Sequence, residues 1–355
     1  MTGFPQKLYE ALNYWAVWFG LSNLSMKASI TPKGAVLLGK HVSCDAFEES
    51  TPLRVVTHAH ADHMIGLKQS LASCEKVLMT SATKDLIDVM MGHLFLMGGH
   101  VETLEYGKAV RYTDESITLL PADHILGAAQ VLVEDAEGAR IAYTGDFRVE
   151  KTPILDVDVL VIEATYGSPS CRRPFEDLKS LLVSLVQDGL KRGPVYIFSY
   201  HGKLQEAMQI LRGADVTAPF VVPQKVFQVS KVCEKHGMRL GRLIRLEEKE
   251  GHELLEKGGP CVAFFHMSSR GKFSQRGLRI YLSGWEFNSP CRRLAENEYV
   301  LALSDHSDFD GLMEYVGLAK PKLVITDNFR VGYAEVLAVE IRKRFNIPAL
   351  PLPKK

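Results

Sequence analysis

Short apolar and β-branched runs follow one another closely in the first half of the chain, and turn residues bound each of them. The runs are AVLLG, LRVVTH, KVLMTS, ESITLLPA, AQVLVED, ARIAYTG and VDVLVIEA, which lie between residues 35 and 164. Helical stretches such as residues 82–96 separate some of these runs. Strands at this density, with helices between them, predict a sheet-rich α/β layer structure.

The pattern changes after Gly167. Leucine and valine repeat at helical spacing over residues 174–191, a strand follows at 195–199, and residues 202–222 repeat the helix and the strand. A strand and a helix about every 25 residues predict a second, Rossmann-like layer. The tail then returns to the strands LALS and KLVIT and to helices over residues 308–318 and 334–345. At roughly 150 residues per domain, 355 residues predict two domains.

Composition excludes several classes of protein. Hydrophobic residues make up 46% of the chain and charged residues 24%, which excludes a disordered protein. The 42 basic and 42 acidic residues cancel, so a polyanion would have to bind at a local site. The six cysteines form no C-x-x-C pair, which argues against a thiolate zinc site and a disulfide framework. We therefore expect reduced thiols in a cytoplasmic, intracellular protein.

Residues 8–24 are rich in apolar side chains, including Trp15 and Trp18. They lack the basic region and the cleavage site of a signal peptide, and they are too short and too polar for a membrane span. We expect an amphipathic helix packed on the body of the protein, with no membrane association. A helix that binds a partner is the alternative.

The sharpest local signal is the segment Thr57-His58-Ala59-His60-Ala61-Asp62-His63, directly after the apolar run LRVV. In an extended loop, His58 and His60 point to the same side, whereas Asp62 and His63 fall at the start of the next helix. Imidazole and carboxylate suit Zn²⁺ at a catalytic site that keeps one position open for water. The alternative is a histidine-rich surface loop, which two further segments make less attractive.

These segments lie at the ends of expected strands. His124 stands beside the small residues Gly127 and Ala128, as a ligand close to a sheet edge requires, and Asp146 follows a strand and a glycine. A carboxylate at this point can bridge two cations about 3.5–4 Å apart, which together clamp a phosphate during displacement. Taken singly, each residue could be a buried histidine or a turn-capping aspartate. Together with the first motif they predict a dinuclear site.

These motifs resemble those of the metallo-β-lactamase fold and, within it, the β-CASP nucleases. The residues that carry the resemblance are Asp45, the motif from His58 to His63, His124, Asp146, Glu163 in VIEATYG and His306 in SDHSDF. The phrases PADHILGAAQVLVE, YTGDFR and YLSGWEF are most similar to the DNA ligase-associated exonucleases and the archaeal RNA 3′-end-processing factors. The resemblance implies an αββα sandwich formed by residues 31–166 and 286–355. It also implies an inserted Rossmann-like β-CASP domain at 167–285, after an N-terminal helical extension at 1–30.

The same resemblance implies one or two zinc ions, with Mn²⁺ or Mg²⁺ as possible substitutes. His58, His60, His124 and Asp146 would hold the first ion, and Asp62, His63 and Asp146 the second. Asp45 would lie outside the metal ligands. Asp62, Glu163 and His306 would be catalytic, because a histidine held by a carboxylate stays cationic and can donate a proton. A helix-capping surface carboxylate is the alternative for Glu163.

One departure from the family pattern concerns Asp327. RNA-processing members carry a ligand histidine at this position and Artemis-type DNA nucleases carry a valine, whereas the strand KLVIT here leads to Asp327 and Asn328. Asp327 could complete the second zinc site with an oxygen donor. It could equally form a turn with Asn328 and leave the second metal weakly bound.

Two basic segments are candidates for binding substrate phosphate. Free amides at a helix N-terminus, a glycine and a lysine predict an anion site in the segment from Ser199 to Lys203. The second segment contains Ser269, Arg270 and Lys272, and Arg172 and Arg173 are further candidates or solvated surface charges.

The leading hypothesis is a zinc-dependent nuclease acting on single-stranded ends, with DNA favoured by the ligase-associated likeness and a 5′-phosphate favoured by Lys203. The partners would be DNA or RNA ends and repair or ligation proteins. An RNA-processing endo- or exoribonuclease is the main alternative. A small-molecule metallo-hydrolase and a non-catalytic scaffold are further alternatives.

Overall fold

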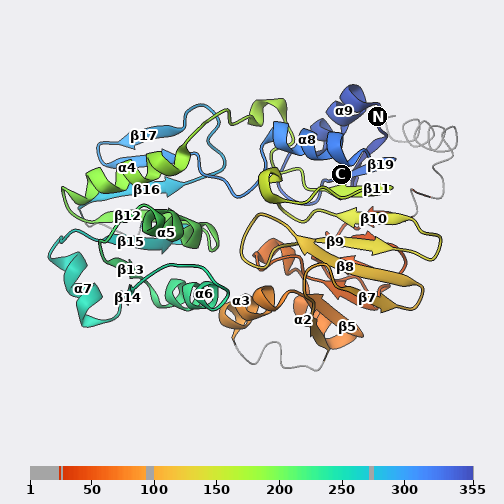
Figure 1. The fold of residues 1–355 in the computed structure, drawn as a ribbon, viewed down its shortest axis with the longest axis horizontal. Helices are drawn as coiled ribbons and strands as arrows, with labels where there is room; N and C mark the ends of the chain where they lie inside the picture. Colours follow the sequence, from red (N-terminus) through yellow and green to blue (C-terminus); the bar gives the residue numbers. More distant parts are fainter. Residues whose placement is uncertain (1–23, 25–26, 93–99, 272–275, 355) are drawn as a thin grey trace, which may run out of the picture.

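The computed structural model describes residues 24, 27–92, 100–271 and 276–354, so the N-terminal segment with Trp15 and Trp18 lies outside the described residues, as does Lys272. Two lobes stand side by side in Figure 1. One contains two sheets and is built from the beginning and the end of the chain, and the other contains a third sheet. In the described part of the chain, no helix combines the length and the apolar character that crossing a membrane requires.

The first lobe is a sandwich of two sheets. The first sheet has the strand order β1 (Ala28–Ile30), β2 (Val36–Leu38), β3 (Val42–Cys44), β4 (Leu53–Val55), β5 (Lys76–Met79) and β6 (Val101–Thr103). The second has the order β20 (Ala349–Leu352), β19 (Leu323–Asp327), β11 (Val159–Ile162), β10 (Arg140–Tyr143), β9 (Ala129–Glu134), β8 (Glu115–Pro121) and β7 (Ala109–Tyr112). Buried side chains from both sheets, such as Leu38 and Val131, pack in one cluster because alternate residues of each strand face inward.

Helices cover the outer faces of this sandwich. α2 (Leu67–Ser73) packs on β5, and α9 (Ala334–Phe345) packs on β19 and β20 beside α8 (Phe309–Ala319). α3 (Ser81–Met91) follows β5 and packs against the other lobe. The expected αββα sandwich is therefore confirmed.

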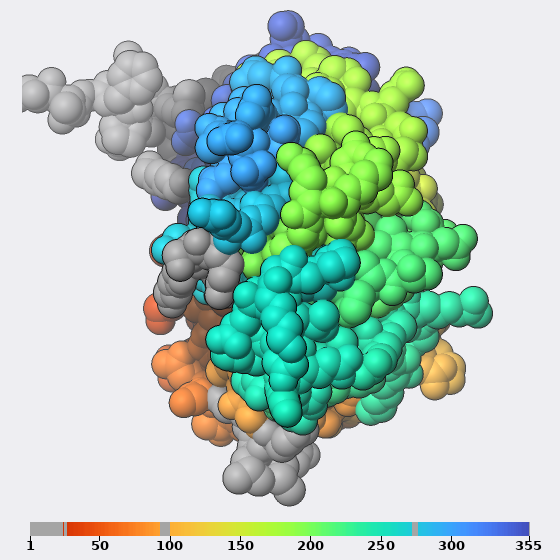
Figure 2. Space-filling view, turned by 90° about the vertical axis from the view of Figure 1, so that its left-hand side faces the viewer, coloured from red at the N-terminus to blue at the C-terminus, as the bar shows by residue number. Residues whose placement is uncertain are grey.

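The second lobe has one mainly parallel sheet. Its strand order is β14 (Leu243–Arg245), β13 (Phe220–Val222), β15 (Val262–His266), β12 (Val195–Ser199), β16 (Leu278–Leu282), β18 (Glu298–Leu301) and β17 (Cys291–Ala295). Its helices are α4 (Leu178–Leu190), α5 (Lys203–Gly213), α6 (Gln224–Lys235) and α7 (Lys249–Glu256). Figure 2 looks onto the outer face of this lobe, where green and teal residues lie in front and orange residues of the first lobe show only at the edge. Parallel strands with crossover helices give the expected Rossmann-like layer.

Two boundaries differ from the sequence-based expectation. β18 pairs with β16 and β17 pairs with β18, so the third sheet continues to Leu301, beyond the expected domain end at residue 285. A strand pattern does not reveal which sheet the strand joins, which explains the difference. α4 begins at Leu178, because Asp177 has a left-handed φ of 56° that a helix cannot include.

Four short 3-10 turns complete the described elements, namely η1 (Ala61–His63), η2 (Val149–Lys151), η3 (Pro169–Cys171) and η4 (Met267–Ser269).

Ion pairs link the two lobes. Arg148 Nη1 lies 2.7 Å from Glu206 Oε1, and Lys235 Nζ lies 2.7 Å from Asp85 Oδ2. The first pair joins the segment after β10 to α5, and the second joins α3 to α6.

Candidate metal centre

Asp45 shapes the loop that carries most of the predicted ligands. The Thr57 backbone N–H donates to Asp45 Oδ1 at 2.8 Å, and the Thr57 hydroxyl donates to Asp45 Oδ2 at 2.7 Å. At the other end of the loop, His63 Nδ1 lies 2.7 Å from the same Oδ2. The Asp45 carboxylate is fully buried. It therefore fastens both ends of the loop and turns His63 Nε2 toward the cluster described next.

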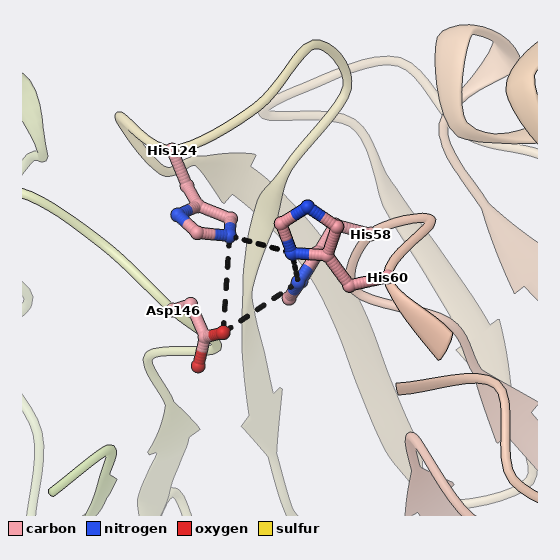
Figure 3. A group of neighbouring side chains, drawn as sticks. All are labelled: His58, His60, His124 and Asp146. Atoms are coloured by element: carbon pink, nitrogen blue, oxygen red, sulfur yellow. Dashed lines mark hydrogen bonds and ion pairs between the residues drawn. The ribbon is translucent and has the colours of Figure 1, made fainter. Parts of the chain in front are cut away.

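Four side chains from three loops converge in Figure 3: His58 and His60 follow β4, His124 follows β8 and Asp146 follows β10. One ligand atom of each lies within 4.8 Å of the others. His60 Nδ1 is 3.2 Å from His58 Nε2 and 3.1 Å from His124 Nε2, and Asp146 Oδ2 is 3.6 and 3.8 Å from the same two nitrogens. A tetrahedral ion with ligands at about 2.1 Å separates its ligand atoms by about 3.4 Å. The four residues therefore fit one metal ion.

The imidazoles of this group have the protonation state that a metal ion requires. Burial lowers the pKa of His58 well below its usual value, and it lowers the pKa of His124 to about 3. His124 Nδ1 lies 2.8 Å from the carbonyl oxygen of Asp305, and His60 Nε2 lies 3.2 Å from that of His201. Because a carbonyl only accepts, these nitrogens carry the proton and the other nitrogen of each ring offers a lone pair to the cluster.

Two glycines let the ligand loops approach neighbouring backbone closely. Gly127 follows His124 at a φ of +80°, and a Cβ there would lie 2.7 Å from the backbone nitrogen of Thr83. Gly145 precedes Asp146 at a φ of +57°, and its Cβ would lie 3.0 Å from the Ala129 carbonyl. L-residues rarely adopt such φ values, so glycine is required at both turns.

Asp62 and His63, the other predicted ligands, lie beside the four-ligand group, and the ring centroids of His63 and His58 are 4.0 Å apart. His63 Nε2 is 3.1 Å from Asp146 Oδ2 and 3.7 Å from Asp62 Oδ2, and it makes no hydrogen bond. Burial lowers the pKa of His63, but the carboxylates of Asp146 and Asp45 outweigh burial and raise it to about 10. The Asp62 side chain is 62% exposed, so solvent reaches its carboxylate.

The predicted pair Glu163 and His306 is formed beside the cluster. His306 Nδ1 lies 2.9 Å from Glu163 Oε2, and the Phe147 backbone N–H donates to Glu163 Oε1 at 2.9 Å. His306 Nε2 lies 3.9 Å from Asp146 Oδ2. Burial lowers the pKa of His306, but Glu163 and Asp146 raise it to about 9. His306 therefore holds Glu163 through Nδ1 while its Nε2 lies toward the cluster, and Glu163 is buried and not a surface cap.

Asp327 takes the turn-forming alternative and lies outside the ligand groups of the described residues. Its Oδ1 accepts from the backbone N–H of Phe329 at 2.9 Å, and its Oδ2 accepts from Arg330 Nη1 at 2.6 Å. The turn partners are Phe329 and Arg330, whereas we expected Asn328. Sequence reasoning missed Arg330, although its position three residues after an aspartate could have suggested the pair.

The candidate phosphate residues are less accessible than expected. Lys203 Nζ lies 2.8 Å from Asp305 Oδ1, and both side chains are below 8% exposed. Ser199 is fully buried at the end of β12. Ser269 lies in η4, and Arg270 is exposed and stacks 4.3 Å over the ring of Tyr281. Sequence reasoning also missed Asp305, whose partner lies about a hundred positions away in the chain. A phosphate role for these residues stays a prediction.

Arg172 and Arg173 are both engaged in contacts within the chain. Arg172 Nε lies 2.8 Å from Asp310 Oδ2. Arg173 donates to the carbonyl oxygens of Gly284 and His306, each at 2.8 Å, and its guanidinium lies 4.3 Å over the Tyr166 ring. Arg173 therefore positions the loop that carries His306.

No family model matches the sequence. An uncharacterised protein of Acidianus ambivalens, named for its place in the lig 3′ region, is 45% identical over 38% of this chain and 99% of its own length. A probable DNA ligase of Opitutus terrae is 26% identical over 81% of this chain, and the DNA cross-link repair protein SNM1 of Arabidopsis thaliana is 31% identical over 76%. Further relatives are named as a probable RNase and an endoribonuclease.

The chain belongs to the β-CASP branch of the metallo-β-lactamase fold. It spans 28% of the length of the ligase relative and 59% of the SNM1 relative. A solved structure from Enterococcus faecalis, of a protein of unknown function, has the same fold, with a TM-score of 0.57 and 15% identity over 87% of this chain and 81% of its own. The β-CASP family thus accounts for the sandwich, for the inserted sheet and for the ligand cluster that lies at their junction.

Proposed function

We propose that this protein is a metal-dependent nuclease that hydrolyses phosphodiester bonds in single-stranded nucleic acid. One observation carries the proposal. The four-ligand group includes Asp146, and the cationic His306 faces the carboxylate of that same residue. A zinc ion that binds water as a fifth ligand beside these four residues would activate that water at neutral pH and polarise a phosphate oxygen. Hydrolysis of a phosphodiester needs these two effects and a proton for the leaving oxygen.

His306 would supply that proton. Its Nε2 is the nitrogen turned toward the cluster, since Nδ1 is bonded to Glu163. The Glu163 carboxylate keeps the ring charged and fixes its orientation, and Arg173 holds the backbone of the same loop. Asp62, which solvent reaches, would accept a proton from the attacking water.

Exposed aromatic rings support an unpaired strand as the substrate. Trp285 is 48% exposed and its ring centroid lies 5.0 Å from that of Tyr166, which in turn lies 5.8 Å from His306. Tyr333, 41% exposed, lies 6.5 Å from Trp285. Unpaired bases stack on such rings without sequence preference. We place the bases next to the scissile phosphate on these two side chains.

We further propose that the polymer is DNA and that the enzyme works from a 5′-phosphorylated end in repair or end processing. Similarity to a probable DNA ligase over 81% of this chain supports this choice, as does the similarity to SNM1. An RNA substrate is the second candidate, because other relatives are named as ribonucleases. Arg270 is an exposed residue of the second basic segment and supports a phosphate contact there.

The test is digestion of single-stranded DNA and RNA labelled at the 5′ or the 3′ end, with zinc content measured in the same samples. His60→Ala should lose both metal and cleavage. His252→Ala is the matched control, because His252 lies on α7 with a side chain that is 63% exposed, and it should leave both unchanged. Cleavage of neither polymer by metal-loaded wild type, or undiminished cleavage by His60→Ala, would refute the proposal. Faster cleavage of RNA than of DNA would refute only the choice of DNA and would leave the nuclease proposal standing.

A further inference from the structure

Arg330 lies buried next to the carboxylate of Asp327 and the backbone of Asp62, two of the predicted ligands of the second metal. Its side chain is only 8% exposed, Nη1 binds Asp327 Oδ2 at 2.6 Å, and Nη2 donates to the carbonyl oxygen of Asp62 at 3.2 Å. Its Nε is buried without a hydrogen-bond partner. A guanidinium is always charged, so it places a permanent positive charge in the region that a second metal ion would occupy.

Asp327 cannot serve as a ligand while this arrangement holds. Its Oδ2 accepts from the guanidinium, and its Oδ1 accepts from the backbone N–H groups of Phe329 and Arg330 at 2.9 and 3.3 Å. Both oxygens are therefore engaged, and the carboxylate is 2% exposed. The groups of three or more potential ligands that the described residues form include neither Asp62, His63 nor Asp327. The second site thus lacks the ligand that could complete it.

The charge balance explains why Arg330 belongs in this position. Asp45, Asp146 and Asp327 are carboxylates that are at most 5% exposed, and buried carboxylates require compensating positive charge. Although burial raises the pKa of Asp45, His63 and Arg330 outweigh it and hold the pKa below its usual value. A divalent ion next to Asp327 and Asp62 would meet like charge in a region of low dielectric.

We infer that Arg330 replaces the second metal ion of this centre, which holds a single metal at His58, His60, His124 and Asp146. This inference rests on the metal centre of the proposed function. In this arrangement His63 is a positioning residue that stands between the carboxylates of Asp45 and Asp146. Arg330 supplies the positive charge that a second ion would bring to a bound phosphate.

Zinc content per chain tests the inference independently of nuclease activity. Wild type, saturated with zinc and then dialysed, should retain one ion by elemental analysis. Arg330→Ala removes the charge and frees Asp327, and it should retain two. The double variant Arg330→Ala with Asp327→Asn should return to one ion, because the added ligand is gone. Arg330→Lys keeps the charge and should retain one.

Each outcome either supports or overturns the inference. Two ions in wild type, or one ion in folded Arg330→Ala, would overturn it. If circular dichroism shows that Arg330→Ala is unfolded, zinc content is compared among wild type, Arg330→Lys and Asp327→Asn. All three should hold one ion, and two ions in any of them would overturn the inference. No bound metal in wild type would overturn the proposed function itself, which distinguishes the two failures.

Discussion

Lys203→Met removes one partner of a buried ion pair that joins α5 to the loop before His306. The Lys203 and Asp305 side chains are 7% and 6% exposed and lie 2.8 Å apart. Loss of one partner leaves a buried carboxylate without compensation, which costs about 3–5 kcal/mol of unfolding free energy. At about 2 °C per kcal/mol for a large domain, Tm should fall by about 6 °C or more.

Differential scanning calorimetry and denaturant unfolding measure this loss, and a double-mutant cycle with Asp305→Asn isolates the pair. The double variant should be more stable than the sum of the two single changes predicts, because neither unpaired charge remains. Lys191→Met is the matched control, since Lys191 is 74% exposed and its partner Asp188 is 67% exposed. Unchanged stability of Lys203→Met, combined with lost discrimination between 5′-phosphate and 5′-hydroxyl ends, would refute this reasoning and favour the phosphate pocket.

Three further predictions concern catalysis, substrate binding and acid stability. Glu163→Gln should lower kcat by about 10²-fold or more with little change in KM, because His306 loses the carboxylate that keeps it protonated. An unchanged kcat in steady-state assays would contradict this role. Trp285→Ala should raise KM for single-stranded substrates several-fold without lowering kcat or zinc content, and an equal loss on a mononucleotide ester would argue against base stacking. Burial raises the pKa of Asp85, but Lys235 and His236 outweigh it and lower the pKa. Stability from this pair is therefore present above the unfolded-state pKa of about 3.9 and is lost as pH falls through the folded value. Asp85→Asn should reduce the loss of unfolding free energy as the pH falls below about 4. An acid loss identical to that of wild type would show that the Asp85 contacts with Lys235 and His236 do not contribute.

Much of the metal centre could be predicted because its geometry is local. His58 and His60 stand two residues apart after a strand, so an extended backbone puts both imidazoles on one side. His124 and Asp146 each follow a strand that ends at the same edge of the sandwich. Periodicity is likewise sufficient for the strand-helix alternation of the second lobe, but it does not show that the sheet extends to Leu301.

Charge partners were decided by the tertiary structure. The sequence predicts that Lys203 is an exposed phosphate ligand at a helix N-terminus. In the structure it pairs with Asp305, which belongs to the other lobe. The sequence is equally compatible with Asp327 as a metal ligand and as a turn residue. The buried contact with Arg330 distinguishes these two roles. Spacing along the chain determined which side chains share a strand end, because backbone geometry fixes their direction over a few residues. Which cation meets which carboxylate depends on how distant segments pack and on which groups they remove from water.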